Sequence, residues 1–178
     1  MKKYLVIGNP IEHSMSPKLH NFWIKENNIK AIYDKKKINE NEIKELISEI
    51  KNEKIHGMNV TIPFKKSVIP FLDELTPLAK EAQSVNTIFK KNNKIIGDNT
   101  DIGGFEKSLK NINYNVKNKK AFILGAGGVA PSIILALKKL GISKIYLSNR
   151  TKKKAEKLSD IHSNVETIDW GKNVNFDI

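Results

Sequence analysis

A glycine-rich turn is the feature that most constrains what this chain can fold into. Residues 121–124 form an apolar run typical of a buried strand, and residues 131–140 are predicted to be helical. The turn between them has the pattern G-x-G-x-x-A and consists of Gly125, Ala126, Gly127, Gly128, Val129 and Ala130. In this setting the first glycine permits a tight turn, the second lets a pyrophosphate approach the backbone, and the alanine permits close helix packing. The pattern favours a dinucleotide site at the N-terminus of the helix over a plain structural turn.

The next predicted strand, residues 144–148, indicates which dinucleotide is bound. It ends in Asn149-Arg150-Thr151, where NAD-binding versions of this fold carry an acidic residue for the ribose 2′-hydroxyl. Arg150 is the only arginine among 31 basic residues, and a guanidinium can bond two oxygens of a 2′-phosphate. The alternative is an ordinary surface residue at a helix start. The pattern favours NADP over NAD.

The rest of the chain alternates strands with helices, which predicts the α/β class. Strands are expected at 3–8, 31–34, 55–61, 86–89 and 94–97, and helices at 17–28, 39–51, 76–82 and 101–110. Asn92-Asn93 is expected to form the turn of a hairpin. The predicted division is an N-terminal α/β substrate-binding domain, residues 1–101, and a Rossmann-type dinucleotide-binding domain, residues 102–178.

Composition narrows the class of protein. The chain has a net charge of +12 and no cysteine, and no apolar run approaches the ~18 residues of a membrane span. Its lysines are dispersed and no arginine-and-aromatic platform is interleaved with them, so a solvated surface is favoured over nucleic-acid binding. The expectation is a cytoplasmic protein with no membrane or nucleic-acid partner and no metal site.

Polar side chains follow the predicted strands of the first half. They are Ser14 and Ser16 after the first strand, then Asn59, Thr61 and Lys65, then Asn86, and finally Asp101. Ligands of α/β sheets bind at the carboxyl ends of strands, so these residues are expected to hold a substrate.

Six motifs in this half and the next resemble those of the shikimate dehydrogenase family. They are His-Ser-x-Ser-Pro from His13, Asn-Val-Thr-x-Pro-x-Lys from Asn59, Val-Asn-Thr from Val85, Asn-Thr-Asp from Asn99, Gly-Ala-Gly-Gly from Gly125, and Asn-Arg-Thr from Asn149. They occur in family order and at similar spacing along nearly the whole chain. The resemblance implies an NADP-dependent enzyme that reversibly reduces 3-dehydroshikimate to shikimate, in the pathway to chorismate and the aromatic amino acids. The resemblance is also compatible with a homodimer.

The resemblance also implies roles for individual residues. Ser14 and Ser16 would bind the substrate carboxylate, and Asn59, Thr61 and Asn86 the ring hydroxyls. Lys65 and Asp101 would form the catalytic pair, because an ammonium can stabilise the charge that develops on the carbonyl oxygen and supply a proton. The implied cofactor-binding residues are Gly125, Ala126, Gly127, Gly128, Val129, Ala130, Asn149, Arg150, Thr151 and Lys154.

The chain departs from the family pattern at three places. Gln83-Ser84 stands where the family usually has Gly-Ala, and Lys154 stands where a second arginine is common. The sequence stops at Phe176-Asp177-Ile178, which is expected to begin a further strand, so the dinucleotide domain is predicted to be incomplete. Two alternatives therefore stay open: a quinate/shikimate dehydrogenase of relaxed specificity, and a truncated fragment that binds ligands without turnover.

Overall fold

The computed structural model describes residues 1–178, which divide into two compact units, Met1–Asn99 and Thr100–Ile178. The boundary predicted from the sequence, after residue 101, lies two residues further along the chain. Each unit is a continuous stretch of chain with its own sheet. None of the helices is long and apolar enough to cross a membrane.

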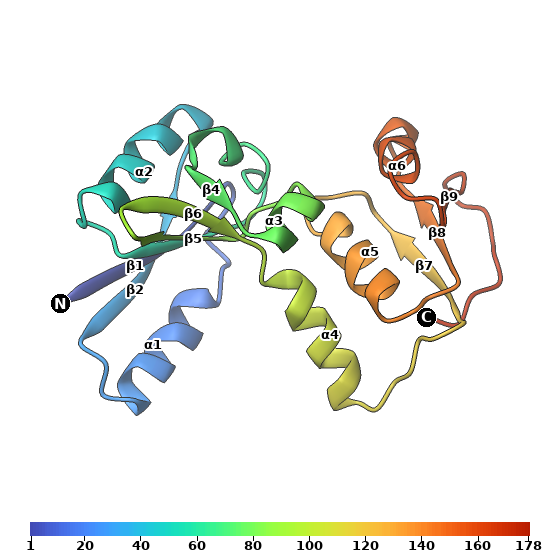
Figure 1. The fold of residues 1–178 in the computed structure, drawn as a ribbon, viewed down its shortest axis with the longest axis horizontal. Coiled ribbons are helices and arrows are strands. Elements are labelled where there is room, and N and C mark those ends of the chain that lie inside the picture. Colours follow the sequence, from blue (N-terminus) through green and yellow to red (C-terminus); the bar gives the residue numbers. More distant parts are fainter. The chain divides into compact units, whose positions relative to one another are not determined.

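The first unit is built on a six-stranded mixed sheet with the order β2-β1-β3-β5-β6-β4. The strands are β1 (Lys2–Gly8), β2 (Ala31–Lys37), β3 (Gly57–Val60), β4 (Glu74–Leu75), β5 (Thr87–Lys91) and β6 (Lys94–Asp98). The helices are α1 (Ser16–Glu26), α2 (Ile43–Lys51) and α3 (Pro77–Ala82), with short 3-10 turns η1 (Glu40–Glu42) and η2 (Ile69–Phe71). β1 runs parallel to both β2 and β3, and α1 and α2 lie on opposite faces of the sheet (Figure 1).

The main core of this unit lies under α2. Ile43, Leu46, Ile47 and Ile50 recur at helical spacing, and all four are buried. They belong to one cluster with residues of the central strands, including Ile7, Met58, Val60 and Ile88. The apolar stripe predicted for residues 39–51 is therefore present, although its first turn is the separate 3-10 turn η1.

The β5–β6 hairpin turns at Asn92-Asn93, as the sequence predicted. Both residues have positive φ, 50° and 61°, which a tight two-residue hairpin turn requires. Asparagine tolerates this conformation better than most other residues.

Helix α1 is attached to the sheet in an unexpected way. Leu19, Phe22 and Trp23 form an apolar face, as predicted, but they remain 47%, 58% and 49% exposed. The helix is instead joined to the edge strand by the side chain of Asn21. Its Nδ2 donates to the carbonyl of Tyr33 at 2.7 Å, and its Oδ1 accepts from the N–H of Tyr33 at 2.9 Å. Polar contacts to the backbone of β2 thus fix this side of the helix.

The second unit contains a three-stranded parallel sheet with the order β7-β8-β9. Its elements are α4 (Asp101–Asn111), β7 (Lys120–Leu124), α5 (Ala130–Lys139), β8 (Lys144–Ser148), α6 (Lys152–Ser159) and β9 (Val165–Thr167). A separate core cluster, which includes Ile134, Leu137, Ile145 and Leu147, packs α5 against the strands. This is the strand–turn–helix arrangement that the glycine-rich turn predicted.

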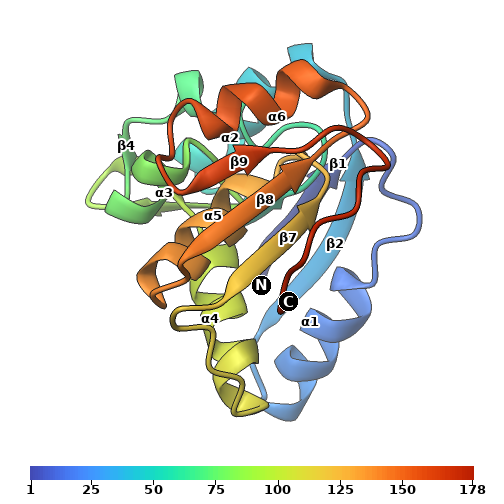
Figure 2. The ribbon, with the colours of Figure 1, turned by 90° about the vertical axis from the view of Figure 1, so that its right-hand side faces the viewer.

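The last residues do not form the regular strand that the sequence suggested. They nevertheless lie along the open edge of β7 (Figure 2), where the N–H of Phe122 donates to the carbonyl of Ile178 at 2.8 Å. The N–H of Asp177 donates to the carbonyl of Lys120, also at 2.8 Å. The segment is therefore bonded to the edge of β7 without the repeated pairing that defines a strand.

Candidate functional site

A small cavity in the first unit collects three of the residues expected to bind substrate. It has a volume of about 270 Å³ and is lined by Ser14, Ser16 and Thr61, together with Val6, Pro10, Ile11 and His13. Ser14 follows β1, Ser16 begins α1, and Thr61 follows β3. Because β1 and β3 are parallel neighbours, their carboxyl ends meet at one edge of the sheet and bring these loops together. His13, the first residue of the His-Ser-x-Ser-Pro motif, lines the same cavity.

The loop that carries Ser14 is fixed by a carboxylate that the sequence did not single out. Glu12 accepts from the N–H of Ile11 at 3.0 Å and from Lys37 Nζ at 3.1 Å. Backbone N–H groups of Glu12 and Ile11, with the ammonium of Lys37, lower the pKa of Glu12 to about 2. The backbone carbonyl of Glu12 also accepts from Lys35 Nζ. These bonds tie the loop to the end of β2.

Asn59, on β3, and Asn86, the residue before β5, belong to a second polar group. Asn59 faces Thr87 across the β3–β5 pair. Its Nδ2 donates to the carbonyl of Asn86 at 3.2 Å and to Thr87 Oγ1 at 3.1 Å. Thr87 Oγ1 in turn donates to Asn86 Oδ1 at 3.0 Å. A fourth residue, Tyr33, donates its hydroxyl to Asn59 Oδ1 at 2.6 Å, and sequence reasoning missed it.

Lys65 is set apart from the other lysines by its burial. It is 9% exposed and is the only lysine among the buried polar residues. It lies in the turn that follows Thr61, and its carbonyl accepts from the N–H of Val85 at 2.8 Å. Asp101, the other member of the expected catalytic pair, is the first residue of α4 and belongs to the second unit. The pairing of the two side chains stays a prediction.

The glycine-rich turn has the geometry that its sequence requires. Gly125 has φ of +116°, which side-chain-bearing residues rarely adopt, and its N–H donates to the carbonyl of Ser148 at 2.7 Å. A Cβ added to Gly127 would meet no atom within 4 Å, so the backbone there faces open space. Ala130 is buried at the start of α5. The turn thus leaves room for a ligand next to the N-terminus of a ten-residue helix.

The turn after β8 is linked to the glycine-rich turn by Asn149. Its Oδ1 accepts from the N–H of Ala126 at 3.0 Å, and its Nδ2 donates to the carbonyl of Thr151 at 2.8 Å. Thr151 is the N-cap residue of α6, and the side chains of Arg150 and Lys154 are exposed around this helix start. Two cationic groups therefore lie near the residue that braces the glycine-rich turn.

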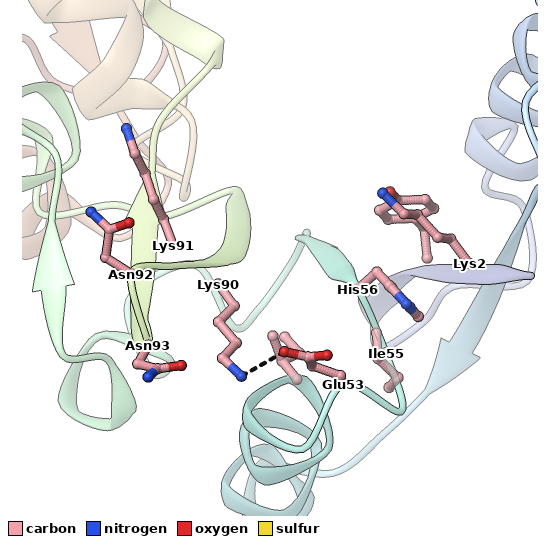
Figure 3. Close-up of a pocket in the computed structure, with 10 residues that line it drawn as sticks. Lys2, Glu53, Ile55, His56, Lys90, Lys91, Asn92 and Asn93 are labelled. Atoms are coloured by element: carbon pink, nitrogen blue, oxygen red, sulfur yellow. Dashed lines mark hydrogen bonds and ion pairs between the residues drawn. The ribbon is translucent and has the colours of Figure 1, made fainter.

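A larger hollow of about 440 Å³ lies elsewhere in the first unit, near the start of β1 and the turn of the β5–β6 hairpin (Figure 3). Lys2, Lys90, Lys91 and His56 are among the residues that line it. Lys90 Nζ forms an ion pair with Glu53 Oε1 at 2.8 Å, which lowers the pKa of Glu53. None of the residues predicted from the motifs lines this hollow.

Two family models match the chain, one in each unit. Residues 6–88 match the shikimate dehydrogenase substrate binding domain, and residues 106–171 match shikimate / quinate 5-dehydrogenase. The shikimate dehydrogenase (NADP(+)) of Pelagibacter ubique is 60% identical over 177 residues, which cover 99% of this chain and 67% of the relative. The chain belongs to the shikimate dehydrogenase family.

The chain also covers only part of the length of other members of the family. The shikimate dehydrogenase (NADP(+)) of Aquifex aeolicus is 44% identical over 93% of this chain and 64% of the relative. The chain thus spans about two thirds of the length of the family members that it matches.

Solved structures of the family share the fold. The crystal structure of the Aquifex aeolicus shikimate dehydrogenase has a TM-score of 0.88 at 43% identity and covers 94% of this chain and 62% of that one. The Thermus thermophilus shikimate 5-dehydrogenase, crystallised in complex with NADP(H) and shikimate, has a TM-score of 0.85 at 28% identity, over 94% of this chain and 63% of that one.

Proposed function

We propose that the protein is an NADP-dependent shikimate dehydrogenase that interconverts 3-dehydroshikimate and shikimate. The observation on which this rests most is Lys65, the buried lysine in the turn that follows Thr61 of the substrate cavity. Lysine is almost never fully buried without a specific reason, and reduction of a ketone requires a group that stabilises a developing oxyanion. Family membership supports the same reaction.

Substrate recognition and proton transfer are assigned to residues of the first unit, together with Asp101 of the second unit. The hydroxyls of Ser14 and Ser16 are proposed to bind the substrate carboxylate at the edge of the sheet, and Thr61 and Asn59 to bond ring hydroxyls. The ammonium of Lys65 stabilises negative charge on the carbonyl oxygen during reduction and donates a proton to it. Asp101 is proposed to orient Lys65.

The second unit is proposed to hold NADP(H), whose reduced form would supply the hydride for reduction of the ketone. The open backbone at Gly127 and the N-terminus of α5 suit a pyrophosphate, because free N–H groups and the helix dipole favour an anion there. Arg150 and Lys154 suit the 2′-phosphate. Thr151 and Asn149 shape the turn between these two subsites.

A quinate/shikimate dehydrogenase is a second candidate, because the model that matches residues 106–171 covers both activities. The two differ in whether a ring with an added hydroxyl is accepted. Turnover with quinate at a rate comparable to that with shikimate would favour the second candidate.

The test is to titrate the chain with shikimate and with NADP⁺, and then to measure reduction of NADP⁺ with shikimate as substrate. Because the chain spans about two thirds of the length of its relatives, the assay is also run on a form extended with a relative's C-terminal third. We expect saturable shikimate binding by the chain. No binding at millimolar shikimate would refute the proposed substrate.

Lys65→Ala tests the chemistry, and Lys66→Ala is its matched control because Lys66 is the exposed neighbour. We expect the first variant to lower turnover in the active form by about two orders of magnitude, with a much smaller change in shikimate affinity. The control should keep normal turnover. Near-normal turnover in Lys65→Ala would remove Lys65 from the mechanism.

A further inference from the structure

We propose that Tyr33 is a positioning residue, which fixes the Asn59 amide so that Asn59 offers its oxygen, and not its N–H₂ group, to a substrate hydroxyl. The inference rests on the proposed function and deepens it, because it states how one group of the site selects its ligand. Tyr33 lies on β2, and it is separated from Asn59 by 26 residues along the chain.

The hydroxyl of Tyr33 acts as a hydrogen-bond donor to Asn59. The side chain is 5% exposed, and burial raises the pKa of the phenol above its ordinary value, so the hydroxyl stays protonated. Its oxygen lies 2.6 Å from Asn59 Oδ1. A short bond from a buried, protonated phenol leaves Asn59 Oδ1 as the acceptor.

The orientation of the Asn59 amide follows from the chemistry of its neighbours. The group that contacts the carbonyl of Asn86 must be Nδ2, because a carbonyl oxygen can only accept. Nδ2 has two hydrogens, and they are donated to the Asn86 carbonyl and to Thr87 Oγ1. Oδ1 has two lone pairs, and Tyr33 occupies one of them. The remaining capacity of Asn59 is therefore one acceptor site, which suits the O–H of a ring hydroxyl.

Tyr33 itself is held at both its backbone and its ring. Asn21 makes the two hydrogen bonds to its backbone that join α1 to β2. The ring of His20 stacks on the ring of Tyr33, with centroids 4.0 Å apart and an interplanar angle of 13°. His20 Nδ1 lies 2.9 Å from the carbonyl of Ser16, so it donates to that carbonyl. A continuous set of contacts thus runs from Ser16 through His20 and Tyr33 to Asn59.

The first experiment compares Tyr33→Phe with Tyr4→Phe in the full chain by calorimetric titration with shikimate. Both rings line the same apolar cavity of about 340 Å³, so each variant removes one phenol hydroxyl from the same region. We expect shikimate affinity to fall about fivefold to tenfold in Tyr33→Phe, in line with one lost hydrogen bond, and to stay unchanged in Tyr4→Phe. NADP⁺ affinity should be the same in both. Equal shikimate affinity in wild type and Tyr33→Phe would overturn the proposal.

A double-mutant cycle with Asn59→Ala separates positioning from a general structural effect. If Tyr33 acts through Asn59, its substitution by phenylalanine should have no further effect on shikimate affinity in the Asn59→Ala background. Additive losses would show that Tyr33 acts independently and would overturn the proposal.

A ligand-free measurement keeps the inference distinguishable from the proposed function. In wild type, the side-chain N–H₂ protons of Asn59 should exchange slowly with water in NMR spectra, because both are donated and the amide is pinned at Oδ1. Tyr33→Phe should speed this exchange at least severalfold, and Tyr4→Phe should leave it unchanged. Absence of shikimate binding by wild type would refute the proposed function alone, whereas unchanged exchange in Tyr33→Phe would refute the role of Tyr33.

Discussion

At the scale of single residues, a few charged groups have surroundings that differ from those of the many exposed lysines. Arg150 lies just before Thr151, the N-cap residue of α6, and one residue after the asparagine that braces the glycine-rich turn. Its guanidinium has the planar fork that lysine lacks, and such a fork can bond two phosphate oxygens at once. Replacing Arg150 should therefore weaken the binding of NADP⁺ more than the binding of NAD⁺.

We expect Arg150→Ala to weaken NADP⁺ binding by roughly 1.5–3 kcal/mol while changing NAD⁺ binding little, because only NADP⁺ carries the 2′-phosphate. Parallel titrations with the two dinucleotides measure the difference. Lys153→Ala, at an exposed lysine of α6, is the control. An equal loss of affinity for both dinucleotides would show that Arg150 supports the fold and does not bind the 2′-phosphate.

Glu12 should affect how the free energy of unfolding changes with pH in the acid range. Its pKa in the folded chain, about 2, lies below the ordinary value of 4.5. A depressed carboxyl pKa contributes stability above the ordinary value, and that contribution is lost as the pH falls from about 4.5 towards 2. In Glu12→Gln the free energy of unfolding should therefore decline less steeply across this range.

Urea unfolding at a series of pH values measures that decline, with Glu81→Gln, an exposed glutamate of α3, as the control. The effect should be small and should shrink in high salt, because Glu12 and Lys37 are both more than half exposed. Identical acid profiles for wild type and Glu12→Gln would contradict the prediction.

Sequence patterns predicted the polar residues of the candidate site but not the side chains that hydrogen-bond to them. Thr61 directly follows β3, and Ser14 and Ser16 lie between the end of β1 and the first turn of α1, so strand order alone predicts that they meet. The contact between Tyr33 and Asn59 depends on how β2, β1 and β3 are aligned, and no local pattern contains that alignment. A buried tyrosine has the same sequence signal whether it only packs or also donates a hydrogen bond.

At the scale of elements, several helices have the same hydrogen-bond pattern at their C-terminal ends. Five helices end at a residue with positive φ that donates to a carbonyl three residues back, while the next N–H reaches a carbonyl five residues back. These residues are Asn28, Glu53, Gln83, Asn113 and Gly141. Glycine takes this conformation without strain and asparagine tolerates it, whereas glutamine and glutamate are strained by their Cβ.

Gln83→Gly should therefore stabilise the protein by about 1 kcal/mol, because it relieves strain at the end of α3. This is also the residue that the family resemblance predicts at the position. The bond from Gln83 Nε2 to the carbonyl of Lys80, 2.7 Å, is lost, but it is exposed to solvent and contributes little. Chemical unfolding gives the difference, and Asn28→Gly should show a smaller gain. A net loss of stability in Gln83→Gly would mean that this bond outweighs the strain.

Elements with strong local signals were predictable, and short ones were not. The hairpin at Asn92-Asn93 and the stripe of α2 each have a pattern that points to one conformation. β4 is only two residues long and depends on pairing with β6, so nothing in its own sequence marks it as a strand.

At the scale of the whole molecule, each unit is a single uninterrupted stretch of chain. No strand of one sheet comes from the other unit, and each unit has its own core. Units with these properties fold alone in many proteins.

We expect a fragment of residues 1–99 to unfold cooperatively and to bind shikimate, because it contains the whole cavity and the whole six-stranded sheet. Urea unfolding followed by circular dichroism, together with calorimetric titration, tests this. A fragment of residues 1–82 is the control, and it should not fold because it lacks β5 and β6. An unfolded 1–99 fragment would show that the first unit depends on the second.

The uninterrupted course of each unit has a consequence during protein synthesis. The first unit is complete in sequence when Asn99 has been added, and the 79 residues of 100–178 are still to come. At ~5–20 residues per second a ribosome needs roughly 4–16 s to add them, whereas a hairpin such as β5–β6 closes in about 1–10 μs. The cavity lined by Ser14, Ser16 and Thr61 is therefore expected to form on the nascent chain while the last residues of the second unit are still being added. A ligand of that cavity can then stabilise the growing polypeptide while the second unit is still being made.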